Sequence, residues 1–114
     1  MHSEENDILL RILIGENDRF EGKPLYEAIV LKARKLDLAG ATVLRGILGF
    51  GAHSRIKSAR VLGLSTDLPV VIEIVDKREN IDKLLPFLDG SIDEGMVTME
   101  SVRVIKYRHS EKSS

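Results

Sequence analysis

The order of apolar and polar residues in the first half of the chain predicts a strand, a helix and a second strand. Residues 7–14 form an apolar run, rich in Ile and Leu, that is too short for a helix and is typical of a buried strand. Apolar residues then recur at helical spacing between a proline and a glycine, which predicts a helix over 24–38. Residues 41–50 are β-branched and apolar and predict a second strand, in which Gly46 and Gly49 indicate a bulge or a close backbone approach.

The second half of the chain repeats this order after a long connection. Residues 51–68 show no sustained period, apart from a helical turn expected near 55–61, and connections of this length are usually functional or mobile. An alternating strand follows at 70–76. A helix at 78–89 is predicted to be strained or ended near its proline, and a last strand covers 97–107.

The order β-α-β, long connection, β-α-β predicts an α+β, ferredoxin-like βαββαβ fold. In this fold the first and third strands are central neighbours in a four-stranded antiparallel sheet, and both helices cover one of its faces. We expect residues 1–114 to form one domain, because this length is the common size of a single domain. The polar ends, 1–6 and 109–114, are expected to be flexible.

The sheet face away from the helices is predicted to be apolar enough to drive self-association. Arg11 and Glu73 should lie on this face and interact across the two central strands. The apolar residues expected around them are Leu9, Leu13, Val71 and Val75. Such a face is too apolar for the solvent side of a monomer. The alternative is that a terminal segment of the same chain covers it.

Charge and composition narrow the function classes. The 17 basic and 18 acidic residues give a net charge of -1, so no general attraction to nucleic acid or to anionic membranes is expected. No apolar run approaches the roughly 18 residues of a membrane-spanning helix, and the first residues lack a signal-peptide pattern, so a cytoplasmic location is expected. The absence of Cys excludes disulfides and thiolate metal sites. The absence of Gln and the scarcity of Asn are consistent with a thermophilic source.

An anion-binding site is predicted where the second strand ends. No acidic residue lies between Asp37 and Asp67. The stretch instead holds glycines and basic or imidazole side chains, among them Gly46, Gly49, Gly51, Arg45, His53, Arg55, Lys57 and Arg60. Glycines let backbone N–H groups approach an anion closely, and guanidinium groups bind phosphate oxygens in pairs. The alternative is that the glycines serve turns and the basic residues solvate a loop. The chain has no GxxxxGK[ST] motif, so a Walker nucleotidase is not supported.

A second segment able to face an anion precedes the last strand. In DGSIDEGMVT, Gly90 and Gly95 bracket a turn whose backbone could wrap a phosphate or a sugar. The acidic residues of this segment oppose an anion unless a cation is present, and taken alone the segment is a plain turn. Lys106 and Arg108 end the last strand, an edge strand in this topology, from which they either reach a neighbouring subunit or stay solvated.

No catalytic constellation is predicted. His2, His53 and His109 lie in the N-terminal arm, the connection and the tail, and none stands at metal-ligand spacing with another ligand. Ser54 and Ser58 have no evident base. We therefore expect a binding protein that requires no cofactor, and not an enzyme.

Two motifs resemble the PII signalling family. Gly49, Phe50 and Gly51, followed by a long basic stretch, resemble the GFGRQKG signature with which PII proteins enter their T-loop. Residues 87–111 (FLDGSIDEGMVTMESVRVIKYRHSE) are similar to the PII run RTGEIGDGKIFVLPVEEVIRIRTGE in glycine spacing and in a basic-x-basic pair. The resemblance covers residues 7–108 and is closest to an uncharacterised PII-like branch that shares the ATVLRGILGFG pattern.

This resemblance implies a homotrimer that binds an adenine nucleotide between subunits and docks its T-loop on an unidentified target protein. The residues it implies at the nucleotide are Gly49, Phe50, Gly51, Arg55, Lys57, Gly90, Gly95, Met96, Lys106 and Arg108. Met96 departs from the family, because it stands where PII has the phosphate-binding lysine of GDGK. ADP or AMP is therefore expected to bind better than ATP, with or without magnesium. The alternative on the same fold is a trimeric metal-binding protein of the copper-tolerance type, with His53 and loop carboxylates as ligands.

Overall fold

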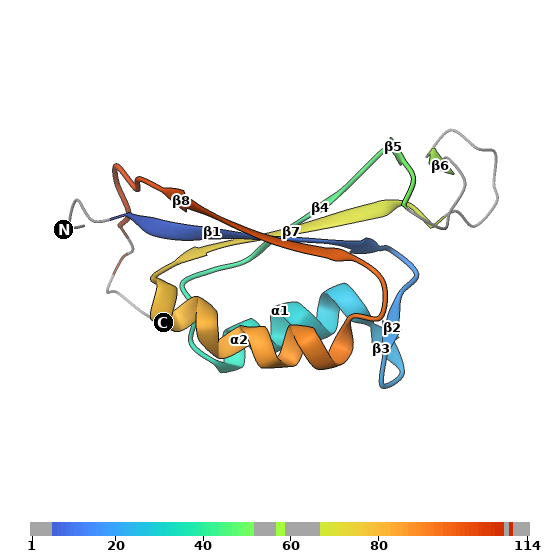
Figure 1. Ribbon diagram of the computed structural model, residues 1–114, viewed down its shortest axis with the longest axis horizontal. Helices are drawn as coiled ribbons and strands as arrows, with labels where there is room; N and C mark the ends of the chain where they lie inside the picture. The colour runs from blue at the N-terminus through green and yellow to red at the C-terminus, as the bar shows by residue number, and fades with distance from the viewer. Residues whose placement is uncertain (1–5, 52–56, 59–66, 109, 111–114) are drawn as a thin grey trace.

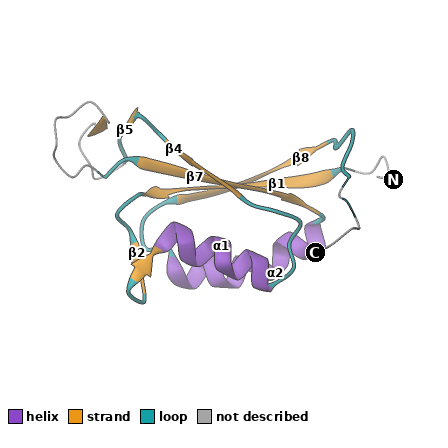
Figure 2. Cartoon of the chain, turned by 180° about the vertical axis from the view of Figure 1, so that it is seen from behind, coloured by secondary structure: helices purple, strands orange, loops and turns teal. Residues whose placement is uncertain are grey.

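Two helices packed on one face of a four-stranded antiparallel sheet make up the fold (Figures 1 and 2). The computed structural model describes residues 6–51, 57–58, 67–108 and 110. The strand order is β4-β7-β1-β8. The elements are β1 (Asp7–Gly15), α1 (Leu25–Lys35), β4 (Thr42–Arg45), β7 (Pro69–Asp76), α2 (Arg78–Ser91) and β8 (Met96–Val102). The predicted α+β, ferredoxin-like arrangement is confirmed, with β1 and β7 as central neighbours.

The core lies between the sheet and the helices. Alternate residues of the two central strands point into it, as the period of two predicts, and these are Leu10, Ile12, Ile14, Val70, Ile72 and Ile74. The helical residues packed against them are Leu25, Ile29, Ala33, Ile81, Leu84 and Leu88. Complete burial of one such side chain contributes about 1.5–3 kcal/mol, so this cluster is the main source of stability.

A short hairpin stands between β1 and α1. It consists of β2 (Arg19–Phe20) and β3 (Lys23–Pro24). Phe20 packs edge-to-face against Phe87 of α2, with the ring centroids 5.3 Å apart. The hairpin is therefore fixed to the helical layer and not to the sheet, as its position below the strands in Figure 1 shows.

The predicted strand at 41–50 is interrupted. β4 ends at Arg45, and the chain pairs again only at β5 (Leu48–Gly49). The interruption occurs where Gly46 passes Pro69: the Gly46 N–H donates to the Pro69 carbonyl at 2.7 Å, and a Cβ on Gly46 would lie 2.7 Å from Cγ of Pro69. No side chain fits in that space, so the predicted close backbone approach at this glycine is confirmed.

β6 (Lys57–Ser58) pairs with β5 as a short antiparallel stem. The prediction of a helical turn at 55–61 is therefore wrong at these two residues, which make ladder hydrogen bonds with the preceding strand. The rest of that turn lies outside the described residues. So do the predicted flexible ends, apart from Asn6 and Ser110.

The first helix is shorter than predicted at its C-terminal end. α1 ends at Lys35, because Asp37 adopts a positive φ of 63° and the Leu38 N–H turns back to the carbonyl of Ala33. This is the hydrogen-bond pattern of a Schellman-type helix end, here with an aspartate in the left-handed position that glycine usually takes.

The second helix was predicted to be strained or ended near Pro86, and of these alternatives an end at Pro86 is wrong. α2 continues to Ser91, although a proline inside a helix removes one hydrogen bond. Pro86 is exposed, whereas Leu84 and Leu88 on either side of it are buried in the core. Packing of the buried face therefore holds the helix together across the proline.

The last strand is also shorter than the predicted 97–107. β8 ends at Val102, which pairs with Asp7 at the very start of β1. Residues 103–107 continue past the first residue of their partner strand, so they have no strand of the described chain beside them. The chain therefore leaves the sheet at Val102.

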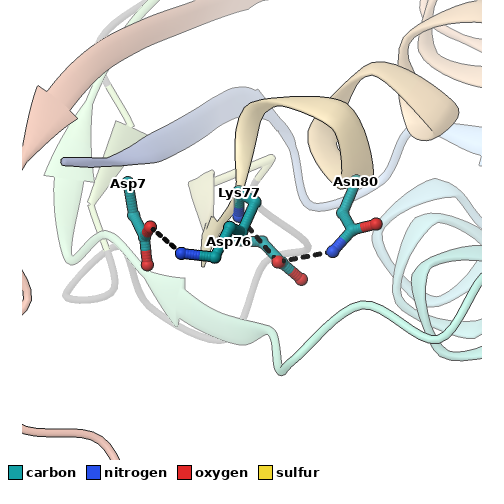
Figure 3. A network of polar contacts seen from close by, with 4 residues as sticks. All are labelled: Asp7, Asp76, Lys77 and Asn80. Carbon is teal, nitrogen blue, oxygen red and sulfur yellow. Dashed lines mark hydrogen bonds and ion pairs between the residues drawn. The ribbon is translucent and has the colours of Figure 1, made fainter. Parts of the chain in front are cut away.

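A buried polar network ties the start of α2 to two other segments (Figure 3). The Asp76 carboxylate accepts hydrogen bonds from the backbone N–H of Lys77 at 2.6 Å, from Nδ2 of Asn80 at 2.9 Å and from the backbone N–H of Ala39 at 2.8 Å. Lys77 in turn extends its Nζ to within 3.3 Å of the buried carboxylate of Asp7. One carboxylate therefore joins α2 to the segment that precedes β4, and the other joins α2 to β1.

We expect Ile29→Ala to lower the free energy of unfolding by about 2–5 kcal/mol, because Ile29 is fully buried and truncation leaves a cavity. Leu31→Ala, in the same helix, is the control: Leu31 is 49% exposed, so its loss should cost less than about 1 kcal/mol. Urea unfolding at one fixed protein concentration measures both. Equal losses would contradict the assignment of α1's buried face.

Candidate functional site

The sheet face away from the helices, called the outer face below, is organised in three rows by the strand register. The rows are Leu44, Val71, Leu13 and Met96; Thr42, Glu73, Arg11 and Thr98; and Val75, Leu9 and Glu100. No helix of the described chain covers this face (Figure 2). Leu44 and Met96 are 50% and 57% exposed at its two edges. The predicted apolar outer face is therefore confirmed.

Arg11 lies at the centre of the outer face between two carboxylates. Its Nε and Nη2 are each 3.0 Å from Oε2 of Glu73, and its Nη1 is 3.5 Å from Oε1 of Glu100. The predicted contact between Arg11 and Glu73 is confirmed, and the register sets the two residues directly opposite one another. Glu100 joins them from β8, the strand on the other side of β1. The cluster has two negative charges and one positive charge, within an otherwise apolar face.

The first predicted anion segment lies at one end of the sheet, at the loop base, which comprises Gly46–Gly51 and Asp67–Pro69. The chain enters the long connection through 46–51, the outgoing leg, and comes back from it through 67–69, the return leg. A Cβ on Gly49 would lie 2.9 Å from Cγ of Pro69, so Gly49 approaches the return leg about as closely as Gly46 does. Phe50 is 68% exposed just beyond the β5 strand. Gly46 and Gly49 therefore serve close packing of the chain against Pro69.

The second predicted anion segment lies at the same end of the sheet, on the β8 edge. A Cβ on Gly95 would lie 2.7 Å from the carbonyl oxygen of Leu13, so this glycine lets the chain approach β1 closely just before β8 begins. Gly90, in contrast, lies inside α2, and the prediction that it opens a turn is wrong. Helix α2 reaches Ser91 because its buried face remains packed up to that residue.

Two of the basic residues predicted to contact the nucleotide lie far from both glycine segments. Lys106 and Arg108 follow the C-terminal end of β8, at the opposite end of the sheet from Met96. Met96 and Val102 are six residue steps apart along the strand, a distance of about 20 Å. Arg55 lies outside the described residues, and Lys57 is described only as part of β6.

The structure thus brings the two glycine segments to one end of the sheet but not into contact. Leu44 and Met96 occupy the two ends of a single row that crosses four strands. At the usual strand spacing this row is about 14 Å wide. The loop base and Gly95 therefore lie on opposite edges, and within one chain they do not form one cleft.

Two acidic residues near the loop base were not recognised in the sequence. Glu16 pairs with Arg45, whose Nε lies 3.2 Å from its carboxylate oxygens, and Asp67 accepts the backbone N–H of Asn17 at 2.8 Å. The partners are 29 and 50 residues apart in the chain. The signal available was the acid-poor stretch between Asp37 and Asp67, which ends at one of these two residues.

Within the described ranges, no three His, Asp or Glu side chains are grouped so as to hold a metal ion. His53, the ligand of the metal-binding alternative, lies outside those ranges. No helix in the described part of the chain is long and apolar enough to cross a membrane.

Gly95→Ala is expected to lower the melting temperature, because the new methyl group would meet the backbone of β1 and overpacking costs about 1–3 kcal/mol. Gly90→Ala is the matched control five residues earlier. A Cβ there has no atom within 4 Å, and alanine favours a helix by about 1 kcal/mol over glycine, so the melting temperature should hold or rise. Calorimetry measures the melting temperatures of both variants, and an unchanged melting temperature for Gly95→Ala would contradict the close contact of Gly95 with β1.

Two solved structures share this fold over most of their length. A PII-like signalling protein from Thermus thermophilus superimposes with a TM-score of 0.65 at 17% identity, over 89% of this chain and 91% of its own. CPII from Thiomonas intermedia K12, a nitrogen regulatory PII-like protein bound to ADP, AMP and bicarbonate, gives a TM-score of 0.64 at 17% identity, over 89% and 90%. At this identity the likeness establishes the PII-like fold.

Other proteins are more similar to this chain in sequence than these two structures are. A UPF0166 protein of Aquifex aeolicus is 41% identical over 97 residues, which cover 85% of this chain and 91% of the relative. The UPF0166 protein MJ1524 of Methanocaldococcus jannaschii is 36% identical over 99 residues, or 86% and 91%. The family model DUF190 (Uncharacterized ACR, COG1993) matches residues 7–104, from the first residue of β1 to just past the end of β8. The chain therefore belongs to the DUF190 family, a branch with the PII-like fold.

Proposed function

We propose that this protein is a nucleotide-responsive regulator that binds an adenine nucleotide between the subunits of a homotrimer. It acts by contact with a target protein, without catalysis. The observation that supports the proposal most directly is the position of the two glycine segments, at one end of the sheet but on opposite edges. A function assigned from fold alone would be weaker, because related folds carry different sites.

Each edge carries half of such a site. The loop base places Gly49 at the β4 edge, and Gly95 stands directly before Met96 at the β8 edge. In a ring of subunits, the β4 edge of one chain adjoins the β8 edge of the next. The two segments would then face one another across the junction, and their N–H groups would line a single cleft suited to phosphate.

The outer face supplies a reason for the subunits to assemble. No helix of the described chain covers its apolar rows, Leu44 and Met96 are 50% and 57% exposed there, and exposed apolar patches are typical of an interface. Arg11 is already paired with Glu73 and Glu100, so the central charges can be buried with partners in place.

The charges near Gly95 favour a ligand with few phosphates. Met96 provides no positive charge, and Asp93 and Glu94 precede it. Lys106 and Arg108 lie at the far end of the sheet, so they would have to come from a neighbouring subunit. We therefore expect ADP or AMP to bind better than ATP, and magnesium to matter only where it offsets the carboxylates. CPII, with the same fold, binds ADP, AMP and bicarbonate, which is in keeping with this choice.

Sedimentation equilibrium at micromolar concentration should return three times the monomer mass of 12.7 kDa. Leu13→Glu should shift the protein to monomer, because it would bury an unpaired charge in the centre of the outer face. Leu31→Glu is the control, since it adds the same charge to the exposed side of α1 and should leave the trimer intact. A wild-type mass of 12.7 kDa would exclude the trimer.

Isothermal titration calorimetry with ATP, ADP and AMP, with and without magnesium, tests the ligand. We expect saturable binding of ADP and AMP at one site per chain. Met96→Lys should raise the affinity for ATP about tenfold relative to AMP, because a charge-assisted contact to phosphate contributes about 1.5–3 kcal/mol.

Ser101→Lys controls for added charge, because Ser101 is exposed on the same strand near its other end. An equal gain in both lysine variants would mean that only net charge matters and that Met96 is not at the phosphates. The absence of heat with every nucleotide would overturn the nucleotide proposal.

A further inference from the structure

The 15–18 turn, which connects β1 to the β2–β3 hairpin, lies against both legs of the long connection. In the sequence it is merely part of a polar stretch between a strand and a helix. The structure places it at the end of the sheet where β5 and the start of β7 meet, on the side of the hairpin (Figure 1). The turn contacts Arg45, which is 29 positions after Glu16, and Asp67, which is 50 positions after Asn17.

The outgoing leg is held by a side-chain pair. Arg45 ends β4, and its Nε lies 3.2 Å from both carboxylate oxygens of Glu16. The next residue, Gly46, donates its N–H to the carbonyl of Pro69 at 2.7 Å. The pair therefore fixes the chain one residue before it crosses to the return leg.

The return leg is held through the backbone of the turn. The Glu16 N–H donates to the carbonyl of Leu68 at 2.8 Å, and the Asn17 N–H donates to Oδ1 of Asp67 at 2.8 Å. Leu68 is fully buried, so this leg is anchored in the core. Glu16 thus touches one leg with its side chain and the other with its backbone.

Gly15 makes room for the Asp67 carboxylate. A Cβ on Gly15 would lie 2.7 Å and 2.8 Å from the two carboxylate oxygens. Any side chain at this position would push the carboxylate away from Asn17. The turn itself is independent of Asp67, because the Gly15 N–H donates to Asp18 at 3.0 Å and the Asp18 N–H returns to the Gly15 carbonyl at 3.2 Å.

We propose that the 15–18 turn sets the geometry of the loop base, with Glu16 and Asp67 as its positioning residues, and so controls the affinity of the nucleotide site. This inference rests on the proposed function, since the loop base matters for affinity only if the ligand lies beside it. The turn also lies between the two glycine segments of one chain, which would contribute to two different sites of the trimer: a Cβ on Gly95 would lie 2.7 Å from the carbonyl oxygen of Leu13, two residues before Gly15. A shift of the turn would therefore be felt at both glycine segments.

The test uses four variants of the full chain. Glu16→Gln removes the charge of the pair, and Asp67→Ala removes the acceptor of the Asn17 N–H. Gly15→Ala displaces the carboxylate without altering Asp67 itself. The double change Glu16→Arg with Arg45→Glu reverses the ion pair. Asp82→Asn is the matched control, because Asp82 forms an exposed ion pair of 2.9 Å with Arg78 in α2, far from the turn.

Two measurements are made on each variant: amide hydrogen exchange by NMR without ligand, and the ADP dissociation constant. Asp67→Ala and Gly15→Ala should speed exchange of the Asn17 and Gly46 N–H groups about tenfold, because this is the effect expected from the loss of one hydrogen bond. Core amides of β1 should keep their exchange rates. ADP should bind about three- to tenfold more weakly to the three single-residue variants. The reversed pair should restore affinity, and Asp82→Asn should change neither quantity.

The outcomes separate this proposal from the nucleotide proposal. Unchanged exchange in Asp67→Ala and Gly15→Ala would overturn the role of the turn, whatever happens to ADP. Faster exchange with unchanged ADP affinity would show that the turn holds the loop base but does not position the site, and would overturn the proposal as stated. A wild-type protein that does not bind ADP overturns both the nucleotide function and the control of affinity by the turn. Exchange then still reports whether the turn holds the loop base.

Discussion

The alternation of β1 and β7, the two central strands, is the constraint on which the rest of the molecule depends. Both strands carry apolar residues on both faces, so a sheet built on them has two surfaces to cover. The two helices cover one of them and form the core. The other face is not covered by any helix of the described chain, and its polar centre, with Arg11 between two carboxylates, interrupts the apolar surface there. In the proposed trimer, the drive to assemble and the stability of the subunit would thus arise from the same pair of strands.

The proposed site is formed by the two edges of the sheet, which come from different chains, and not by a pocket in one chain. The chain leaves the sheet at Gly46 beside β7 and enters it at Gly95 beside β1, on opposite edges, and at both places a Cβ would lie too close to the neighbouring strand. A subunit built in this way carries two incomplete surfaces. Its ligand would bind at the junction between chains, so binding and assembly would be thermodynamically linked.

Local pattern was enough to predict the frame. The period of two placed Arg11 opposite Glu73, and the glycines of the second strand predicted its close backbone approach. The end of the second helix was not predictable from its proline, because packing of Leu84 and Leu88 overrides the lost hydrogen bond. The contacts of Asp67 and Asp76 join residues 50 and 37 positions apart, and sequence spacing carries no signal for such pairs. The frame is thus set by short-range pattern, whereas the loop base is set by long-range contacts.

The two outer strands of the sheet, β4 and β8, each have a strand neighbour on only one side within the described chain. Their outward N–H and C=O groups are therefore available to pair with any other extended chain, and apolar Leu44 and Met96 stand beside them. A ring that joins unlike edges would occupy both at once. Dilution below the assembly threshold would leave these strand edges bare, so the isolated subunit would be the form most prone to aggregate, and a closed ring would protect the edges.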